Sequence, residues 1–193
     1  MLEEAVEVIR TLWSGGVRSH RGEHYTLDAA RLYSLPDAPP PVLVSGFGPK
    51  AIRLAARVGD GFVTTRPSAE HVRLYREAGG QGPVVGACKF CWGPDEKAAV
   101  ALAHDLWPTE ALSGQLSQEL PMPAHFDEAT ALVTPEMVGE ALPCGPDPAR
   151  YIESINGFVE AGFDELFINQ IGPDLQGFLR FFESEVRPKL SIS

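Results

Sequence analysis

The sequence has little positive charge, few cysteines and no long apolar run. Its 193 residues contain 16 Lys and Arg against 26 Asp and Glu, which gives a formal net charge of −10. Because a surface that follows nucleic-acid phosphates needs clustered Lys and Arg, this balance argues against a nucleic-acid partner. No apolar run approaches the roughly 20 residues that span a bilayer. A helical pattern follows Met1 directly, so we expect a cytoplasmic protein with no leader peptide and no membrane partner.

Two of the three cysteines, Cys88 and Cys91, have a spacing that can suit zinc or redox chemistry. They lie within "PVVGACKFCW", however, and this pattern predicts a strand. Side chains three positions apart on a strand point to opposite faces of the sheet. The sequence has no second cysteine pair beside them. We therefore predict no metal site.

What the sequence does contain is a succession of four strand-then-helix units. Their apolar runs are nearly continuous, which is typical of parallel strands that are buried on both faces. The predicted strands lie near 41–46, 61–65, 83–92 and 164–169. Since 44% of the residues are hydrophobic, the chain can form a core, and we predict one domain over residues 1–193.

Alternating strands and helices fit either a doubly wound sheet or a (β/α)8 barrel. A barrel needs eight units and about 250 residues, and this sequence supplies four units. Strands that are adjacent in chain order would indicate a barrel, whereas a reversal in the sheet would indicate a doubly wound fold. Before the first unit, "GEHYTLDAARLYSLP" predicts a short segment of extended backbone. An insertion at about 108–147 carries short helical pieces, one of them at Glu136–Leu142, and precedes an amphipathic helix in "PDPARYIESINGFVEAG".

A glycine-rich turn follows the first predicted strand. Residues 46–51, "GFGPKA", formally fit the G-x-G-x-x-A pattern of dinucleotide-binding turns. The second strand lacks the acidic residue that would bind a ribose hydroxyl, and Pro49 removes one N–H group from the helix start. The remaining donors near Gly48, Lys50 and Ala51 could hold an anion at the positive end of the helix. A tight turn without a ligand explains the pattern equally well.

The stretches "YSLPDAPPPVLVSGFGPKAIRLAARVGDGFVTT" and "CGPDPARYIESINGFVEAGFDELFINQIGPDLQGFLRFFESEVRPKL" resemble luciferase-like flavin and deazaflavin oxidoreductases. The likeness is to the C-terminal half of the branch typified by coenzyme F-420-dependent glucose-6-phosphate dehydrogenase. It covers essentially the whole chain through the combination of "SGFGPK", "GDGF" and "QIGPD". The resemblance implies a partial (β/α)8 barrel that binds F-420, an 8-hydroxy-5-deazaflavin, at the C-terminal ends of its strands. Hydride then passes between the substrate carbon and C5 of the ring.

The resemblance also implies roles for individual residues. The coenzyme-binding segment matches Val44, Ser45, Gly46, Phe47, Gly48, Pro49 and Lys50. Thr65 and Lys89 match substrate-binding positions. A lysine that points into a barrel costs free energy unless its ammonium group pairs with an anion. Either a ligand or a neighbouring carboxylate can supply that anion. The family's catalytic His and Glu belong to earlier strands, so we assign no catalytic residue here and treat the five histidines as surface residues.

The sequence departs from the sugar-phosphate enzymes at two expected basic positions, which fall near Ser68 and Ala141. Phosphate recognition relies on charge-assisted contacts, so we predict an alcohol or carbonyl substrate rather than glucose 6-phosphate. Its neutral surroundings would include Phe90, Trp92 and Trp107.

Three alternatives to a deazaflavin oxidoreductase stay open. They are an FMN-dependent monooxygenase of the same superfamily, a non-catalytic half barrel that binds a coenzyme or a partner chain, and a nicotinamide dehydrogenase. A half barrel leaves its first and last strands unpaired and exposes apolar side chains. We therefore expect a homodimer, or pairing with the missing barrel half, and no turnover by the isolated chain.

Overall fold

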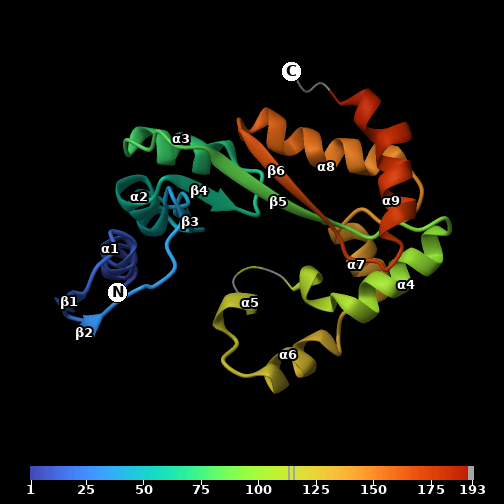
Figure 1. The fold of residues 1–193 in the computed structure, drawn as a ribbon. Coiled ribbons are helices and arrows are strands. Elements are labelled where there is room, and N and C mark those ends of the chain that lie inside the picture. The colour runs from blue at the N-terminus through green and yellow to red at the C-terminus, as the bar shows by residue number, and fades with distance from the viewer. Residues whose placement is uncertain (113, 115, 191–193) are drawn as a thin grey trace. The chain divides into compact units, whose positions relative to one another are not determined.

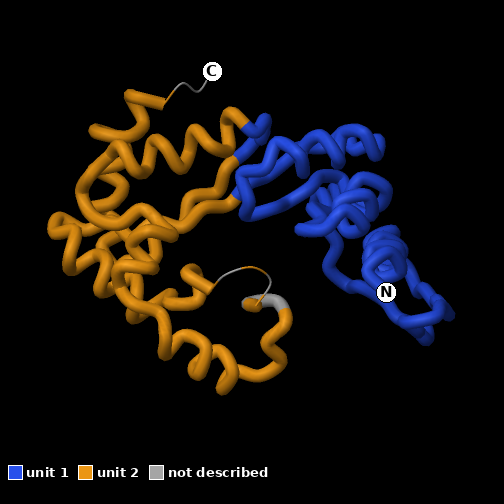
Figure 2. Tube along the Cα trace, turned by 180° about the vertical axis from the view of Figure 1, so that it is seen from behind, with its two compact units in different colours: residues 1–86, 161–165 blue, residues 87–160, 166–193 orange. Residues whose placement is uncertain are grey.

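A computed structural model describes the chain in two compact units (Figure 2). The described residues are 1–112, 114 and 116–190. The first unit comprises residues 1–86 and 161–165, and the second comprises the remainder. Positions 113 and 115 of the predicted insertion, and 191–193 of the predicted domain, lie outside the described residues. The single domain stays a prediction.

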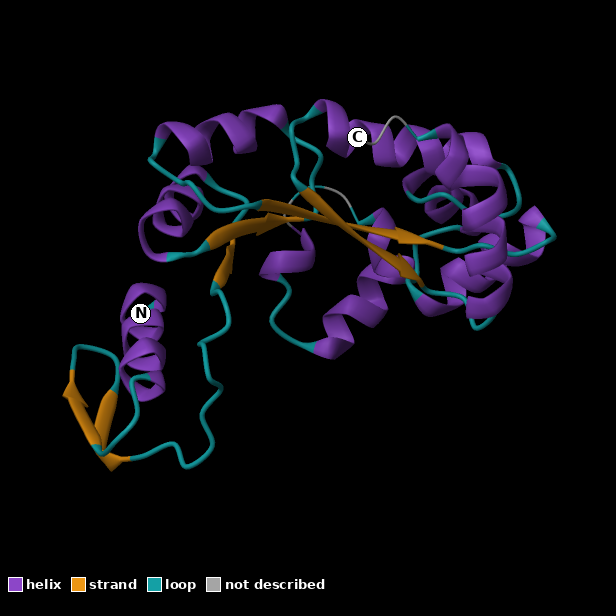
Figure 3. Cartoon of the chain, turned by 45° about the horizontal axis from the view of Figure 1, so that its top comes forward, coloured by secondary structure: helices purple, strands orange, loops and turns teal. Residues whose placement is uncertain are grey.

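The four predicted strands form one sheet whose order follows the chain (Figures 1 and 3). They are β3 (Leu43–Ser45), β4 (Gly61–Thr64), β5 (Val84–Phe90) and β6 (Glu165–Gln170). β3 runs parallel to β4 with Ser45 opposite Val63, and β4 runs parallel to β5 with Phe62 opposite Val84. Because the order has no reversal, the sheet is that of a partial (β/α)8 barrel and not of a doubly wound fold. The sequence prediction is confirmed.

The first unit has three helices, and the second and third of them pack against the first strands of this sheet. Its helices are α1 (Leu2–Trp13), α2 (Pro49–Val58) and α3 (Ala69–Glu77), and an antiparallel hairpin of β1 (Arg18–Arg21) and β2 (Thr26–Ala30) follows α1. A core cluster joins α2 and α3 to the strands through Val44, Ile52, Ala55, Phe62, Tyr75 and Val84. The rings of Phe62 and Tyr75 stack with centroids 5.3 Å apart. This packing anchors the turn between β3 and α2.

The second unit contains the predicted insertion and the last helices. In chain order these are α4 (Glu96–Leu106), η1 (Pro108–Ala111), α5 (Leu116–Glu119), α6 (Pro123–Thr130), α7 (Pro135–Ala141), α8 (Pro148–Glu160), α9 (Leu175–Phe181), a π-helix η2 (Phe182–Val186) and η3 (Arg187–Lys189). Side-chain oxygens of Asp95, Thr134 and Asp174 cap α4, α7 and α9 by accepting amide hydrogen bonds. The predicted helical pieces of the insertion are confirmed.

The two cysteines of the CxxC pattern have different neighbours, as the strand alternation predicts. The backbone of Cys91 pairs with that of Cys144 in an isolated parallel β-bridge in the core of the second unit, and both residues are fully buried with free thiols. The hydrogen bond between these thiols and their burial raise the pKa of Cys144. The thiol of Cys88 donates instead to the carbonyl of Phe167 at 3.8 Å, and burial raises its pKa to about 12.

Across the described part of the chain, none of the helices combines the length and apolarity that crossing a bilayer requires.

Candidate functional site

The turns after β3 and β4 lie side by side at the C-terminal edge of the sheet. The amide of Gly46 donates to the carbonyl of Val63 at 3.4 Å. The guanidinium of Arg66 stacks over the ring of Phe47, 5.6 Å from its centroid. Neighbouring parallel strands end at the same edge, so their turns emerge together. The structure therefore brings Ser45–Lys50 together with Thr64–Arg66.

The two glycines of the first turn have opposite surroundings. A Cβ atom on Gly46 would lie 2.8 Å from the Cβ of Ala51 and 3.1 Å from its carbonyl carbon, so glycine lets α2 begin directly against the strand. A Cβ on Gly48 would meet nothing within 4 Å. Gly46 is required by packing, whereas Gly48 leaves open space beside the helix N-terminus.

That helix N-terminus has the chemistry of an anion site. Gly48 is the N-cap of α2 and forms no side-chain cap, and Pro49 occupies the first turn. The amides of Lys50 and Ala51 have no acceptor within the helix, because the first amides of a helix never do. Together with the helix dipole they favour a negative group beside the open space at Gly48. The arrangement fits the phosphate of a phosphate-bearing ligand.

The other predicted residues of this edge differ in accessibility. Val44 is 4% exposed and belongs to the core, so only its backbone is available to a ligand. Thr65 is exposed just beyond the end of β4, whereas Thr64 is fully buried. The hydroxyl of Thr64 accepts a hydrogen bond from the Arg66 amide at 3.5 Å. Thr64 thus shapes the turn and leaves Thr65 to face solvent, a division that the sequence did not indicate.

In the second unit, Lys89 on β5 meets one group from the insertion and one from the residue that precedes it. Its ammonium nitrogen lies 2.5 Å from a carboxylate oxygen of Glu110 and 5.1 Å from the centroid of the Trp107 ring. Of the two interpretations of this lysine, the structure shows the carboxylate. Sequence reasoning missed Glu110, because a contact across 21 positions leaves no local pattern.

Gln170, in the motif "QIGPD", links the C-terminal ends of β5 and β6. Its side-chain amide accepts from the amide of Trp92 at 2.9 Å and donates to the carbonyl of Trp92 at 3.2 Å. A Cβ on Gly177 would lie 2.3 Å from the Trp92 ring, so glycine allows α9 to approach that ring. The indole N–H of Trp92 is buried and lacks a hydrogen-bond acceptor among the described residues. The motif therefore has a structural role at this strand end.

Two of the three aromatic residues predicted around the substrate pack instead against the last helices, Phe90 within the core and Trp92 partly buried. Phe90 is fully buried, with its ring 4.9 Å from that of Tyr151 on α8. Trp92 stacks on Phe181 of α9 at 5.7 Å. The prediction was wrong for Phe90 because strand alternation places it on the opposite face from Lys89. Trp107 does lie beside Lys89.

Three of the five histidines are half-buried rather than on the surface. The ring of His104 hydrogen bonds to the carbonyl of Val133 at 2.9 Å. The Nδ1 atom of His71, in the first turn of α3, is buried and has no partner among the described residues. His20 contacts Glu4. The expectation of surface histidines was therefore wrong for these three, whereas His24 and His125 are exposed.

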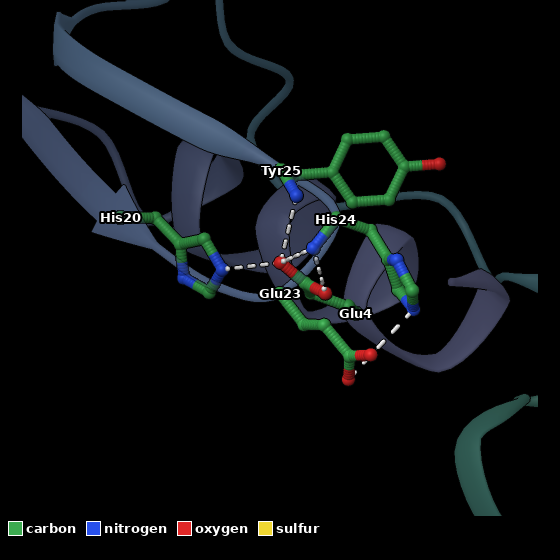
Figure 4. Close-up of polar contacts among 5 residues, drawn as sticks. All are labelled: Glu4, His20, Glu23, His24 and Tyr25. Atoms are coloured by element: carbon green, nitrogen blue, oxygen red, sulfur yellow. Dashed lines mark hydrogen bonds and ion pairs between the residues drawn. The ribbon is translucent and has the colours of Figure 1, made fainter.

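Glu4 connects α1 to the β1–β2 hairpin (Figure 4). Its carboxylate lies 3.2 Å from the ring of His20 and accepts the amides of His24 and Tyr25, both at 2.9 Å. Burial acts to raise the pKa of Glu4. The hydrogen bonds from Tyr25, His20 and His24 outweigh it, so the pKa lies below its ordinary value. These partners satisfy the carboxylate, which makes its role structural.

Two cavities of the first unit lie elsewhere. A cavity of about 550 Å³ is lined by Arg10, Trp13, Ser14, Pro39, Pro40, Pro41 and Asp60. A second, of about 570 Å³, lies along α1 and the end of α2. Neither contains a predicted site residue. Asp60 precedes β4, so the first cavity lies at the end of that strand opposite Thr64 and away from the candidate site at the C-terminal edge.

The sheet order is that of a partial (β/α)8 barrel, and the candidate turns lie at its C-terminal edge. Residues 1–165 match the model of the luciferase-like monooxygenase family, and the chain belongs to this family.

Particular relatives extend this finding. F420-dependent glucose-6-phosphate dehydrogenase of Segniliparus rotundus is 30% identical over 98% of this chain and 60% of its own length. The structure of an F420-dependent secondary alcohol dehydrogenase with an F420–acetone adduct matches at 26% identity with a TM-score of 0.78, covering 97% of this chain and 60% of that one. An FMN complex of 3,6-diketocamphane monooxygenase from Pseudomonas putida shares the fold at 17% identity, with a TM-score of 0.53, over 98% of this chain and 63% of that one. The chain thus spans about 60% of the length of the curated relatives it matches.

Proposed function

We propose that this chain forms part of an oxidoreductase that uses coenzyme F-420 and acts on an alcohol or a carbonyl compound. The observation that carries the proposal is the open glycine turn at the start of α2, joined to the end of β4 by the Arg66–Phe47 contact. The F420-dependent relatives support the choice of coenzyme.

The residues of the turn would hold the coenzyme without reacting with it. The amides of Lys50 and Ala51 would bind its phosphate, and the open space at Gly48 would allow close backbone approach. Ser45 and Phe47 would line its path along the sheet edge. When bound, the deazaflavin supplies C5 as the hydride donor or acceptor. Thr65 and Lys89 are the proposed substrate-contacting residues.

Hydride transfer to a carbonyl also needs a positioned acid within hydrogen-bond reach. By the family resemblance, a His and a Glu on earlier strands would supply it, so a longer chain would carry the complete site. We therefore expect the 193-residue chain to bind F-420 weakly without turnover, and a chain extended upstream to reduce or oxidise a simple alcohol–carbonyl pair.

An absorbance titration of both chains with F-420, FMN and a nicotinamide coenzyme tests the proposal. Binding of F-420 alone supports it. Preferential binding of FMN would favour the alternative of a luciferase-like monooxygenase, which the shared fold of an FMN complex supports. Binding of none by either chain would contradict both and favour a non-catalytic half barrel.

A further inference from the structure

The ion pair between Lys89 and Glu110 places a built-in anion where the proposed substrate would lie. Lys89 comes from β5, and Glu110 comes from η1 in the insertion. Their charged atoms are 2.5 Å apart. Both side chains are largely buried yet retain 30% and 31% exposure, so a ligand can reach this pair.

The pair has no net charge and leaves the ammonium little capacity for a second anion. A phosphate that approached Lys89 would have to displace the Glu110 carboxylate or lie beside it. Displacing Glu110 would leave its largely buried carboxylate unpaired. A phosphate beside Glu110 would bring two negative charges together, so either arrangement is unfavourable. The ring face of Trp107 further holds the ammonium by a cation–π contact.

We infer that Glu110 determines the charge of the substrate, by neutralising Lys89 so that this surface accepts uncharged hydroxyl or carbonyl compounds and rejects phosphorylated or carboxylated ones. The inference rests on the proposed function only in naming the ligand as a substrate. The charge preference itself is a property of three residues in one unit.

The test is a calorimetric titration of the 193-residue chain with inorganic phosphate. The wild type is expected to show no saturable binding at Lys89. Glu110→Gln keeps the side-chain size and removes the charge, so it should show saturable binding at least about tenfold tighter than the limit that the wild-type titration sets, the contribution of one charge-assisted hydrogen bond. Glu110→Asp, which keeps the charge on a shorter side chain, should gain less.

Two controls assign any gain to this pair. Glu128→Gln makes the same charge change at an exposed position on α6 of the insertion and should leave phosphate binding unchanged. The double variant Lys89→Met/Glu110→Gln should lose the gain. Circular dichroism melting curves verify that each variant is folded.

Two outcomes would overturn the inference. One is saturable phosphate binding by the wild type that Lys89→Met abolishes, a result that needs no Glu110 variant. The other is a folded Glu110→Gln chain with no gain. Because the titration contains no coenzyme, failure of F-420 to bind would contradict the proposed function and leave this result intact.

Discussion

Gly46 and Gly48 show how one motif can contain two different requirements. Gly46 lies against the first turn of α2, and Gly48 borders open space. Sequence patterns treat both as members of a coenzyme-binding turn. In the structure, only Gly48 is positioned so that a side chain would affect a ligand without disturbing the helix.

Gly46→Val should destabilise the chain by about 1–3 kcal/mol, because the added side chain collides with Ala51 and overpacks the turn. Gly48→Ala should change the stability by less than about 1 kcal/mol, since its φ of −105° suits alanine. Urea denaturation measures both effects.

The same pair tests the binding turn in a chain that binds F-420. Gly48→Ala should weaken F-420 binding although stability is retained, because the methyl group occupies the space that we assign to the coenzyme. Unchanged affinity in this variant would remove the turn from the site, whatever happens to Gly46→Val.

At the scale of elements, the β1–β2 hairpin is held to α1 by one carboxylate. Glu4 is 14% exposed, and its hydrogen bonds reach the ring of His20 and the hairpin amides of His24 and Tyr25. The extended segment predicted for residues 22–36 thus contains β2, the second strand of a hairpin that Glu4 holds to the preceding helix.

Glu4→Ala should increase hydrogen exchange at the amides of His24 and Tyr25, because they lose their acceptor. Glu7→Ala, at an exposed position of the same helix, is the matched control and should leave exchange unchanged. Equal protection of the two amides in both variants would contradict the role of Glu4.

The attachment should also depend on pH. The folded state lowers the pKa of Glu4 below the reference value of 4.5, so the stabilisation is complete above that pH and is lost as pH falls through the lowered pKa. Protection factors of the two amides in the wild type should fall over this acid range. A pH-independent protection factor would argue that Glu4 is not the connection.

At the scale of the whole molecule, β3 and β6 are the two ends of the sheet order in the described part of the chain. Phe167 on β6 is 63% exposed, and Leu43 on β3 is 37% exposed. Edge strands with exposed apolar side chains favour pairing with another chain. We propose that these edges pair with a second copy or with the missing half of the barrel.

Sedimentation equilibrium should therefore show self-association of the 193-residue chain. Phe167→Ser should weaken it by removing the apolar group at the edge. Leu132→Ser changes a residue that is 83% exposed between α6 and α7, away from the sheet, and should have little effect. A monomer at every concentration, or equal effects of the two substitutions, would contradict edge pairing.

Much of this architecture could be predicted from the sequence because its signals are local. Continuous apolar runs predicted the four strands, and helical periodicity predicted α2, α8 and the helix at Glu136–Leu142. The resemblance then favoured a barrel over a doubly wound sheet, and the strand order confirmed it. The glycine turn was predicted correctly as the place where β3 gives way to α2.

Other properties depend on residues that are distant in sequence, and these only the tertiary structure decided. Strand periodicity separates Cys88 from Cys91, but it cannot tell that Cys91 lies beside Cys144. Nor can it tell that Thr64 is buried while Thr65 is exposed. Lys89 could have met a ligand or a carboxylate, and the choice depended on how the insertion folds back over β5 to bring Glu110 within 2.5 Å. Local sequence thus determined which elements form, whereas packing between distant segments determined which charges and thiols meet.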